Sequence, residues 1–358
     1  MRRVPALLVW AMVTVVAALG VLPGLGSAGS GNDRWPLAHR AASLEFHATV
    51  VPLGERDAWA FGTRRFGYWQ LGPTSYRWDG ERWRDGGLPA GIGDSLVSAG
   101  GSSPENVWAV TSGDDSDVVT LRWDGREWTV VERIPALSAW QLTVVDDDDV
   151  WLFGMESWHH TRAGWARAEV PMTVTHASAR SATDIWAVGS AGQDSDRPLI
   201  GHYDGRSWET TPLGDVLPVE PSAHYALNGV TADASGVRIT ASVSRDTTQT
   251  TTPLLLSRTG GRWQAEEVTA GTGTWSENVG PVPDGRGGHW FLAFTDDNAY
   301  ASVLAHRSAT GAWTVSPVAA APDGAHLSTL AAFPGTTRFL STGRVGDARG
   351  VFFHQVGP

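Results

Sequence analysis

The chain has 358 residues, of which 42% are hydrophobic and 18% are charged, a composition that suits a globular protein with a large core. Because it contains no cysteine, disulfides, zinc–thiolate sites and thiol nucleophiles are excluded. The formal net charge is −11, and no basic run occurs beyond Met1–Arg3. We therefore expect no nucleic-acid partner, since binding to a phosphate backbone depends on clustered cations.

Residues 1–28 are predicted to be a secretory signal peptide. Arg2 and Arg3 form a positively charged start, an apolar stretch follows from residue 6 to residue 21, and Gly26-Ser27-Ala28 offers a cleavage site of small residues. An uncleaved anchor is the alternative, because the apolar stretch approaches the ~20 residues that span a bilayer. Pro23 favours cleavage. We expect a secreted or extracytoplasmic protein of the cell envelope, in contact with a membrane only if this segment is retained.

From residue 29 to residue 358 the chain is predicted to form one domain built from an internal repeat. Each clear unit has a run similar to Trp-Ala-Val-Gly, then a polar loop, then Tyr/Trp-Asp-Gly-x-x-Trp. The runs in the first four units are centred on Trp59, Trp108, Trp151 and Trp186. The tryptophans that close the later hairpin are Trp83, Trp128, Trp165, Trp208, Trp263 and Trp313.

Each unit has the pattern of a small antiparallel sheet. A brief continuous apolar run is typical of a strand covered on both faces. Asp-Gly between aromatic residues indicates a tight hairpin, because glycine accepts the positive φ that the turn requires. The closing tryptophan supplies a large apolar body for packing between sheets. We expect Trp108, Trp128, Trp186 and Trp208 to be largely buried.

This repeat predicts an all-β fold, a single β-propeller of about seven four-stranded blades, with six or eight as alternatives. The last unit supplies only three candidate strands, at residues 327–333, 337–342 and 351–355. Residues 33–37, which include Trp35, resemble the missing outer strand, so we expect the N- and C-terminal strands to pair and close the ring. Trp35 and Trp313 are 278 residues apart, about 46 for each of six steps and within the ~40–50 of propeller repeats.

The motifs of residues 57–208 resemble the repeats of tectonin-type propellers and, more loosely, those of Kelch and Asp-box propellers. The unit is longer than a tectonin repeat, and the Ser-x-Asp-x-Gly spacing of an Asp-box is not kept. The resemblance implies the propeller fold. Tectonin relatives tend to bind sugars or surfaces, whereas Kelch-like relatives range from enzymes to scaffolds, so function has to be argued from a site.

Histidines recur near the start of the segments expected to form the innermost strands. These residues are His47, His176, His224 and His326. Neutral imidazoles that converge at one mouth of the central channel would suit a ligand anion or a metal. The alternative is that they are hydrogen-bonded and inert. We assign no metal and no cofactor.

Loops at the same mouth combine acidic and aromatic residues. Tyr68 and Trp69 follow Phe66 in a loop of the first unit, and Trp140 and Trp275 lie near innermost strands. Acidic loop segments lie at residues 114–117, 194–196 and 296–298. Aromatic faces stack on sugars and cations, so this rim suits a carbohydrate or a cationic peptide. Ordinary solvated turns are the alternative, and the acidic run at residues 146–149 is assigned to such a turn on the opposite face.

No catalytic motif occurs in the sequence: it lacks a Gly-x-Ser-x-Gly elbow, a His-Glu-x-x-His pair, a P-loop and an EF-hand loop. The favoured hypothesis is a noncatalytic binding or scaffold protein, a monomer, that recognises a surface glycan or a cell-surface protein through the channel mouth. A secreted polysaccharide hydrolase or lyase and a structural envelope module are the alternatives.

Overall fold

The computed structural model describes the chain between residues 35 and 355, apart from short segments. These segments are residues 43–44, 67, 114–116, 136–138, 193, 218–219, 221, 246–249, 269–272, 277–278, 296–300, 319–324 and 346–347. The described strands belong to one compact unit, Asp33–Pro358. The predicted signal peptide lies outside the described residues. Within them, no helix has the length and apolar character that a membrane crossing requires.

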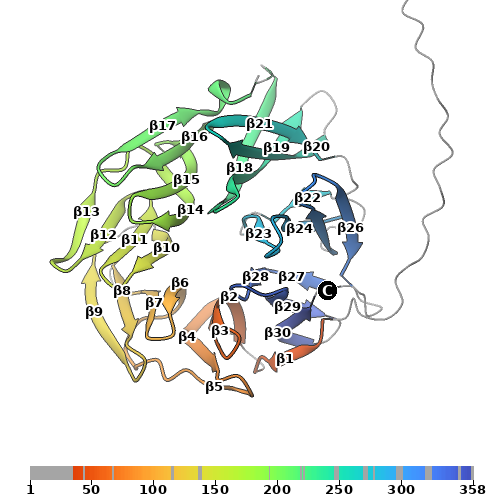
Figure 1. Cartoon of the computed structure of the whole chain (residues 1–358). Coiled ribbons are helices and arrows are strands. Elements are labelled where there is room, and N and C mark those ends of the chain that lie inside the picture. The colour runs from red at the N-terminus through yellow and green to blue at the C-terminus, as the bar shows by residue number, and fades with distance from the viewer. Residues whose placement is uncertain are drawn as a thin grey trace, which may run out of the picture. The chain divides into compact units, whose positions relative to one another are not determined.

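Antiparallel strands form seven sheets, arranged as blades around an axis (Figure 1). The first blade contains β2 (Glu45–Gly54), β3 (Asp57–Phe66), β4 (Trp69–Trp78) and β5 (Trp83–Asp85). The second contains β6 (Leu96–Ser103), β7 (Asn106–Ser112), β8 (Val118–Trp123) and β9 (Trp128–Ile134). The third contains β10 (Ala139–Asp146), β11 (Asp149–Gly154), β12 (Ser157–Thr161) and β13 (Gly164–Ala168). In each blade the first strand lies nearest the axis (Figure 1).

The remaining blades follow in chain order. The fourth contains β14 (Thr173–Ser181), β15 (Asp184–Ala191), β16 (Asp194–Tyr203) and β17 (Trp208–Pro212), after which a 3-10 turn, η1, spans Leu213–Asp215. The fifth contains β18 (Ala223–Asp233), β19 (Gly236–Arg245), β20 (Thr250–Thr259) and β21 (Arg262–Glu267). In the sixth, β22 (Thr274–Trp275) and β23 (Val282–Pro283) both pair with β24 (His289–Phe294), which is followed by β25 (Ser302–Arg307) and β26 (Trp313–Pro317). The predicted all-β propeller of seven blades is confirmed.

The seventh blade joins the two ends of the propeller. It contains β27 (Ala325–Leu327), β28 (Ala331–Ala332), β29 (Arg338–Val345), β30 (Ala348–Gln355) and, from the N-terminal side, β1 (Leu37–Arg40). β1 pairs with β30 in antiparallel register, with Leu37 opposite Phe352. Trp35 precedes β1 and is only 6% exposed in the core. The predicted closure is therefore confirmed, although the strand begins at Leu37 and not at Asp33.

Tryptophans from neighbouring blades pack against each other edge to face. In the first four blades, the tryptophan of the second strand meets the hairpin-closing tryptophan of the next blade, with ring centroids 5.3–6.0 Å apart and interplanar angles of 78–86°. The pairs are Trp59–Trp128, Trp108–Trp165, Trp151–Trp208 and Trp186–Trp263. Such edge contacts are favourable for aromatic rings. Trp108, Trp128 and Trp186 are buried as predicted, whereas Trp208 is only partly buried.

In the second, third and fourth blades, a side chain at the start of the second strand accepts a hydrogen bond from the tryptophan of that strand. The Trp186 indole Nε1 donates to Asp184 Oδ1 at 2.8 Å, and His202 stacks on the Trp186 ring and is bonded to the same carboxylate oxygen at 3.1 Å. The third blade repeats this arrangement with Asp149, Trp151 and His159. The second blade has an asparagine instead, Asn106, whose Oδ1 accepts from Trp108 at 2.9 Å. The indole N–H groups of Trp108, Trp151 and Trp186 are thus paired within their own blades, as most buried polar groups are.

Side chains of the inner strands also tie adjacent blades together. Gln141 of β10 exchanges two bonds with Ala177 of β14, at 2.8 and 2.7 Å. Ser98 of β6 accepts from the Leu142 backbone at 3.0 Å. Each bond connects neighbouring sheets near the axis, where backbone ladders do not reach from blade to blade. The strands that surround the axis are therefore held in fixed positions.

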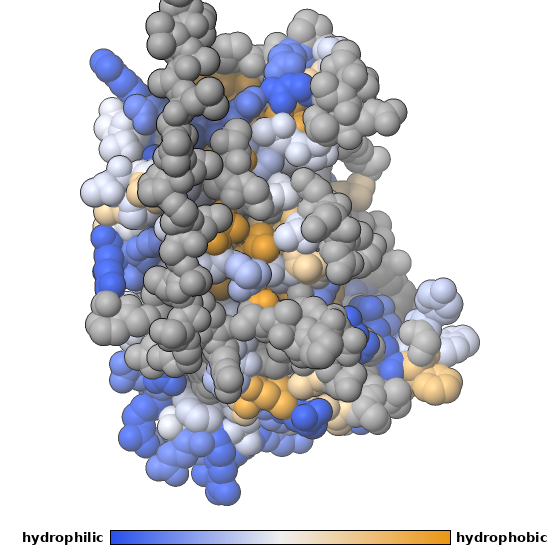
Figure 2. Space-filling model, turned by 90° about the vertical axis from the view of Figure 1, so that its right-hand side faces the viewer, coloured by the Kyte–Doolittle hydropathy of each residue, from blue (hydrophilic) through white to orange (hydrophobic). Residues whose placement is uncertain are grey.

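The side of the molecule drawn in Figure 2 carries many hydrophilic groups. Seen from the side, the coloured part of the molecule carries blue groups along much of its outline, and the orange groups occur as separate patches (Figure 2). Single exposed apolar residues of this kind are normal for a folded protein. Among the described residues, four large apolar side chains are exposed close together at one hairpin, which is described with the candidate site.

Candidate functional site

A cavity of 760 Å³ lies on the axis of the propeller. Residues from all seven blades line it, mainly from the inner strands and their flanking segments. Most of the lining is apolar or carries hydroxyl groups, and the larger polar or aromatic side chains are Arg65, Trp140, Gln141 and His176. A largely apolar concavity with a few polar groups is the usual form of a ligand site.

Inner strands carry a register shift near their start. The shifts leave an extra residue in β2, β6, β10 and β14, namely Ala48, Val97, Trp140 and Thr175. All four extra residues line the axial cavity. A bulge re-aims the side chains around it and is frequent beside functional sites. The repeated bulge therefore shapes one end of the cavity, which we call the mouth.

Trp140 lies in this mouth. Its side chain is 38% exposed, and its indole Nε1 donates to the backbone carbonyl of Val174 in the next blade at 2.7 Å. That bond fixes the ring while part of its surface stays open to the cavity. A held, partly exposed indole offers an apolar face to a ligand without the entropic cost of ordering it. The predicted placement of Trp140 near an innermost strand is confirmed.

His176 is the one predicted histidine whose described side chain lines the axial cavity. It is partly buried, and its Nδ1 is shielded from solvent and has no hydrogen-bond partner. Burial lowers the pKa of His176 from 6.5 to about 4, because the charged imidazolium is disfavoured away from water. At neutral pH this side chain is therefore an uncharged imidazole, one nitrogen of which is buried without a hydrogen-bond partner.

The other predicted histidines do not converge on His176. His224 is exposed and lines separate grooves between the fourth and fifth blades, beside Tyr225 and Pro198. His326 stacks on Phe294, with ring centroids 5.4 Å apart. The backbone of His47 lies opposite Gly62, and its side chain is outside the described set. The predicted convergence is therefore wrong for His224 and His326, and no cluster of metal-binding side chains occurs in the described part of the chain.

Trp275 does not reach the mouth. Its side chain is 2% exposed, it packs against Phe291 and Trp313, and its Nε1 donates to the Leu254 carbonyl at 3.0 Å. The expected role of Trp275 as a solvent-facing platform is wrong. Trp275 belongs to the short strand β22, and the register of β22 with β24 directs its side chain between blades five and six. Because one step along a strand reverses the face, this register decides whether the residue faces the cavity or the core.

The β3–β4 hairpin presents an exposed aromatic group beside the mouth. Phe66, Tyr68 and Trp69 are 65%, 103% and 75% exposed. Phe66 and Trp69 are opposite each other, one step beyond the pair formed by Arg65 and Gln70. Because Arg65 lines the axial cavity, the hairpin rises from its rim. Tyr68 and Trp69 face solvent, as a binding platform requires.

Arg65 was not singled out from the sequence. It lies near the end of β3, at the same end of the antiparallel sheet as the start of β2, and a register shift separates it from Arg64. Its side chain is exposed and contributes to the cavity wall. The sequence places Arg65 at the end of the second strand, beside a loop of the mouth. Arg64 is also an arginine at that end of the strand, so the sequence does not show which of the two lines the cavity.

Much of the predicted acidic rim lies outside the described residues. This applies to residues 114–116 and 296–298 and to the side chains of residues 194–196. Asp117 faces Arg133, with 3.7 Å between Oδ2 and Nη1. The acidic run 146–149 lies in the turn between β10 and β11, as predicted, and Asp148 pairs with Arg162 at 2.7 Å. The acidic rim therefore stays a prediction.

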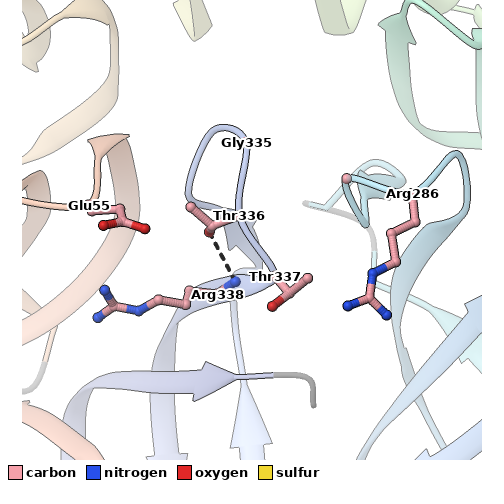
Figure 3. A pocket seen from close by; sticks show the side chains of 7 residues that line it. Glu55, Arg286, Gly335, Thr336, Thr337 and Arg338 are labelled. Atoms are coloured by element: carbon pink, nitrogen blue, oxygen red, sulfur yellow. Dashed lines mark hydrogen bonds between the residues drawn. The ribbon is translucent and has the colours of Figure 1, made fainter. Parts of the chain in front are cut away.

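A second opening, of 430 Å³, lies among the turns at the far end of the inner strands. Thr336 and Thr337 lie at its centre, with Arg338 and Glu55 on one side and Arg286 on the other (Figure 3). The two guanidinium groups point away from each other on opposite sides of the Gly335 turn (Figure 3). They do not form one anion cradle, and the mouth is the better candidate.

Solved structures resemble this chain at the level of the fold. No protein-family model matches the sequence, and no curated protein matches it. The β-propeller domain of the Trilobed protease from Pyrococcus furiosus gives a TM-score of 0.54 at 8% identity, over 87% of this chain and 94% of that one. SapL1 lectin, in complex with alpha methyl fucoside, gives 0.48 at 13%, over 78% and 98%. The six-bladed fucose-binding lectin of Aleuria aurantia gives 0.44 at 10%, over 78% and 96%.

At these identities the likeness shows the propeller fold alone. The protease domain has an open velcro topology, whereas here β1 pairs with β30. The resemblance to tectonin-type repeats stays a prediction.

Proposed function

We propose that this protein is a noncatalytic, extracytoplasmic binding protein that recognises a surface glycan through the channel mouth. One observation carries the proposal: the axial cavity combines a fixed, partly exposed indole, Trp140, with hydroxyl and imidazole groups, and the exposed rings of Tyr68 and Trp69 rise from its rim. Sugars present both apolar C–H faces and hydroxyls, so they suit such a lining.

The dimensions of the site also favour a glycan. A cavity of 760 Å³ falls within the ~300–1,000 Å³ of small-ligand sites, so it accepts one or two sugar units. A longer glycan would extend across the rim, where Trp69 is available for stacking. A cell-surface protein that carries the same glycan would be recognised in the same way.

Glycan binding by the purified protein tests the proposal. We expect saturable binding on a glycan array, lost or weakened at least about tenfold in Trp140→Ala and weakened in Trp69→Ala, since stacked aromatic contacts contribute about 1 kcal/mol or more. Val130→Ala is the matched control, because this residue is also exposed but lies on the outer strand β9. Indifference of all variants to every glycan would overturn the proposal, and release of new reducing ends would overturn its noncatalytic part.

Export is the second element of the proposal and rests on the N-terminal pattern. Intact mass measurement of the protein recovered from outside the cytoplasm should show that the first 28 residues are missing. Retention of the full N-terminus in a membrane fraction would support the anchored alternative.

A further inference from the structure

The charge lining the axial cavity differs from that of the chain as a whole. The sequence has 38 acidic and 27 basic residues, and its net charge is −11. Yet no aspartate or glutamate lies among the described residues that line the cavity, and Arg65 is the one lining side chain with a permanent charge. Where the described lining carries a cation and no carboxylate, it favours anionic over cationic ligands.

We propose that the mouth binds a sugar residue that carries a carboxylate, and that Arg65 is the residue that selects it. This inference rests on the proposed glycan-binding function. A guanidinium group presents a planar fork of donors that matches a carboxylate in a bidentate pair. Among the described residues, no ion pair to Arg65 occurs, so its donors are available to a ligand.

The surroundings of Arg65 place a sugar ring within reach of the same residue. Trp140 lines the same cavity, and the Phe66–Trp69 pair is the next step of the ladder that contains Arg65. A pyranose ring stacked on Trp140 therefore occupies the cavity that Arg65 also lines. His176, which is neutral at ordinary pH, lines the same cavity and brings no charge of its own.

The chain supplies its own control for Arg65. Arg64 precedes it, is likewise exposed, and carries the same charge, but it does not line the cavity. Loss of either arginine changes the net charge of the protein equally. A difference between the two variants therefore reports the cavity and not the overall electrostatic field.

The test uses calorimetric titration with oligosaccharides of galacturonate, glucuronate and mannuronate, each paired with its neutral methyl ester. We expect at least one acid to bind and its ester to bind at least about tenfold more weakly, since a charge-assisted pair is lost. Arg65→Gln should lose the preference for the acid, Arg65→Lys should keep part of it, and Arg64→Gln should behave as wild type. Thermal unfolding followed by circular dichroism should be the same for all four proteins.

Two outcomes separate the inference from the proposed function. If an ester or another neutral glycan binds as tightly as the acid, and Trp140→Ala abolishes that binding, the carboxylate inference is overturned and glycan recognition stands. If no glycan of either kind binds, both are overturned. Equal losses in Arg64→Gln and Arg65→Gln would also overturn the assignment to Arg65.

Discussion

Replacement of Trp108 by alanine tests the physical basis of the propeller core. The side chain is fully buried and packs against His160 and Trp165 of the next blade, with ring centroids 4.8 and 6.0 Å away. A tryptophan buries about 150–250 Å², which at ~25 cal/mol per Å² corresponds to roughly 4–6 kcal/mol. Alanine recovers roughly 1 kcal/mol of this, so we expect a loss of about 3–5 kcal/mol.

The lost indole N–H adds little to that figure. Asn106 Oδ1 accepts from Trp108 Nε1 at 2.9 Å but also from Arg122 Nε at 3.1 Å, so the oxygen keeps a partner in the variant. Urea unfolding followed by far-ultraviolet circular dichroism measures the change. Trp108→Phe should cost less than the alanine variant, and Val130→Ala, at 49% exposure, less than ~0.5 kcal/mol. A loss under ~1 kcal/mol for Trp108→Ala would show that inter-blade tryptophans do not form the core.

Three further predictions concern closure, the polar network and the mouth. Removal of residues 1–32 should leave the unfolding midpoint unchanged, whereas removal of residues 1–41 should lower it strongly or cause aggregation in a thermal scan, because Trp35 leaves the core and the edge of β30 is exposed. Asp184→Ala should lower the free energy of unfolding in urea by about 1–3 kcal/mol, because Trp186 Nε1 and His202 lose their acceptor. Asp184→Asn should lower it less, because an asparagine, Asn106, already accepts from Trp108 in the second blade. The imidazole of His176 should titrate near pH 4 when it is followed by NMR. Because this folded-state pKa lies below the unfolded value, the free energy of unfolding should fall as the pH drops from about 6.5 to about 4, and it should fall less in His176→Gln.

The blade architecture was predictable because its signals are local and repeated. A glycine in the turn after Asp79 and again after Asp124 adopts positive φ, 93° at Gly80 and 96° at Gly125, as the Asp-Gly pattern requires. In each of the first four blades, the third residue of the second strand is a tryptophan, and it is buried. Closure followed from counting strands, because a propeller with an unpaired edge exposes backbone groups.

The site was less predictable because it depends on register, which the sequence does not display. Trp140 and Trp275 both lie in or beside inner strands, yet one faces the cavity and the other the core. Trp140 is the extra residue of a bulge, and Trp275 is in a two-residue strand without one. A bulge shifts every following side chain by one position, so alternation cannot be read through it.

The dependence on register also explains why the sequence predicted four histidines at the mouth and did not predict Arg65 there. A shared position along the strand says that residues lie at one level of the propeller, but not that they face the axis. His326 and His176 are at such a level, and only His176 turns inward. Arg65 reaches the cavity from the second strand and Arg64 does not, because successive residues of a strand point to opposite faces. The positive charge of the mouth therefore depends on which of two adjacent arginines faces the axis, and the sequence shows that the two alternate without showing which one turns inward.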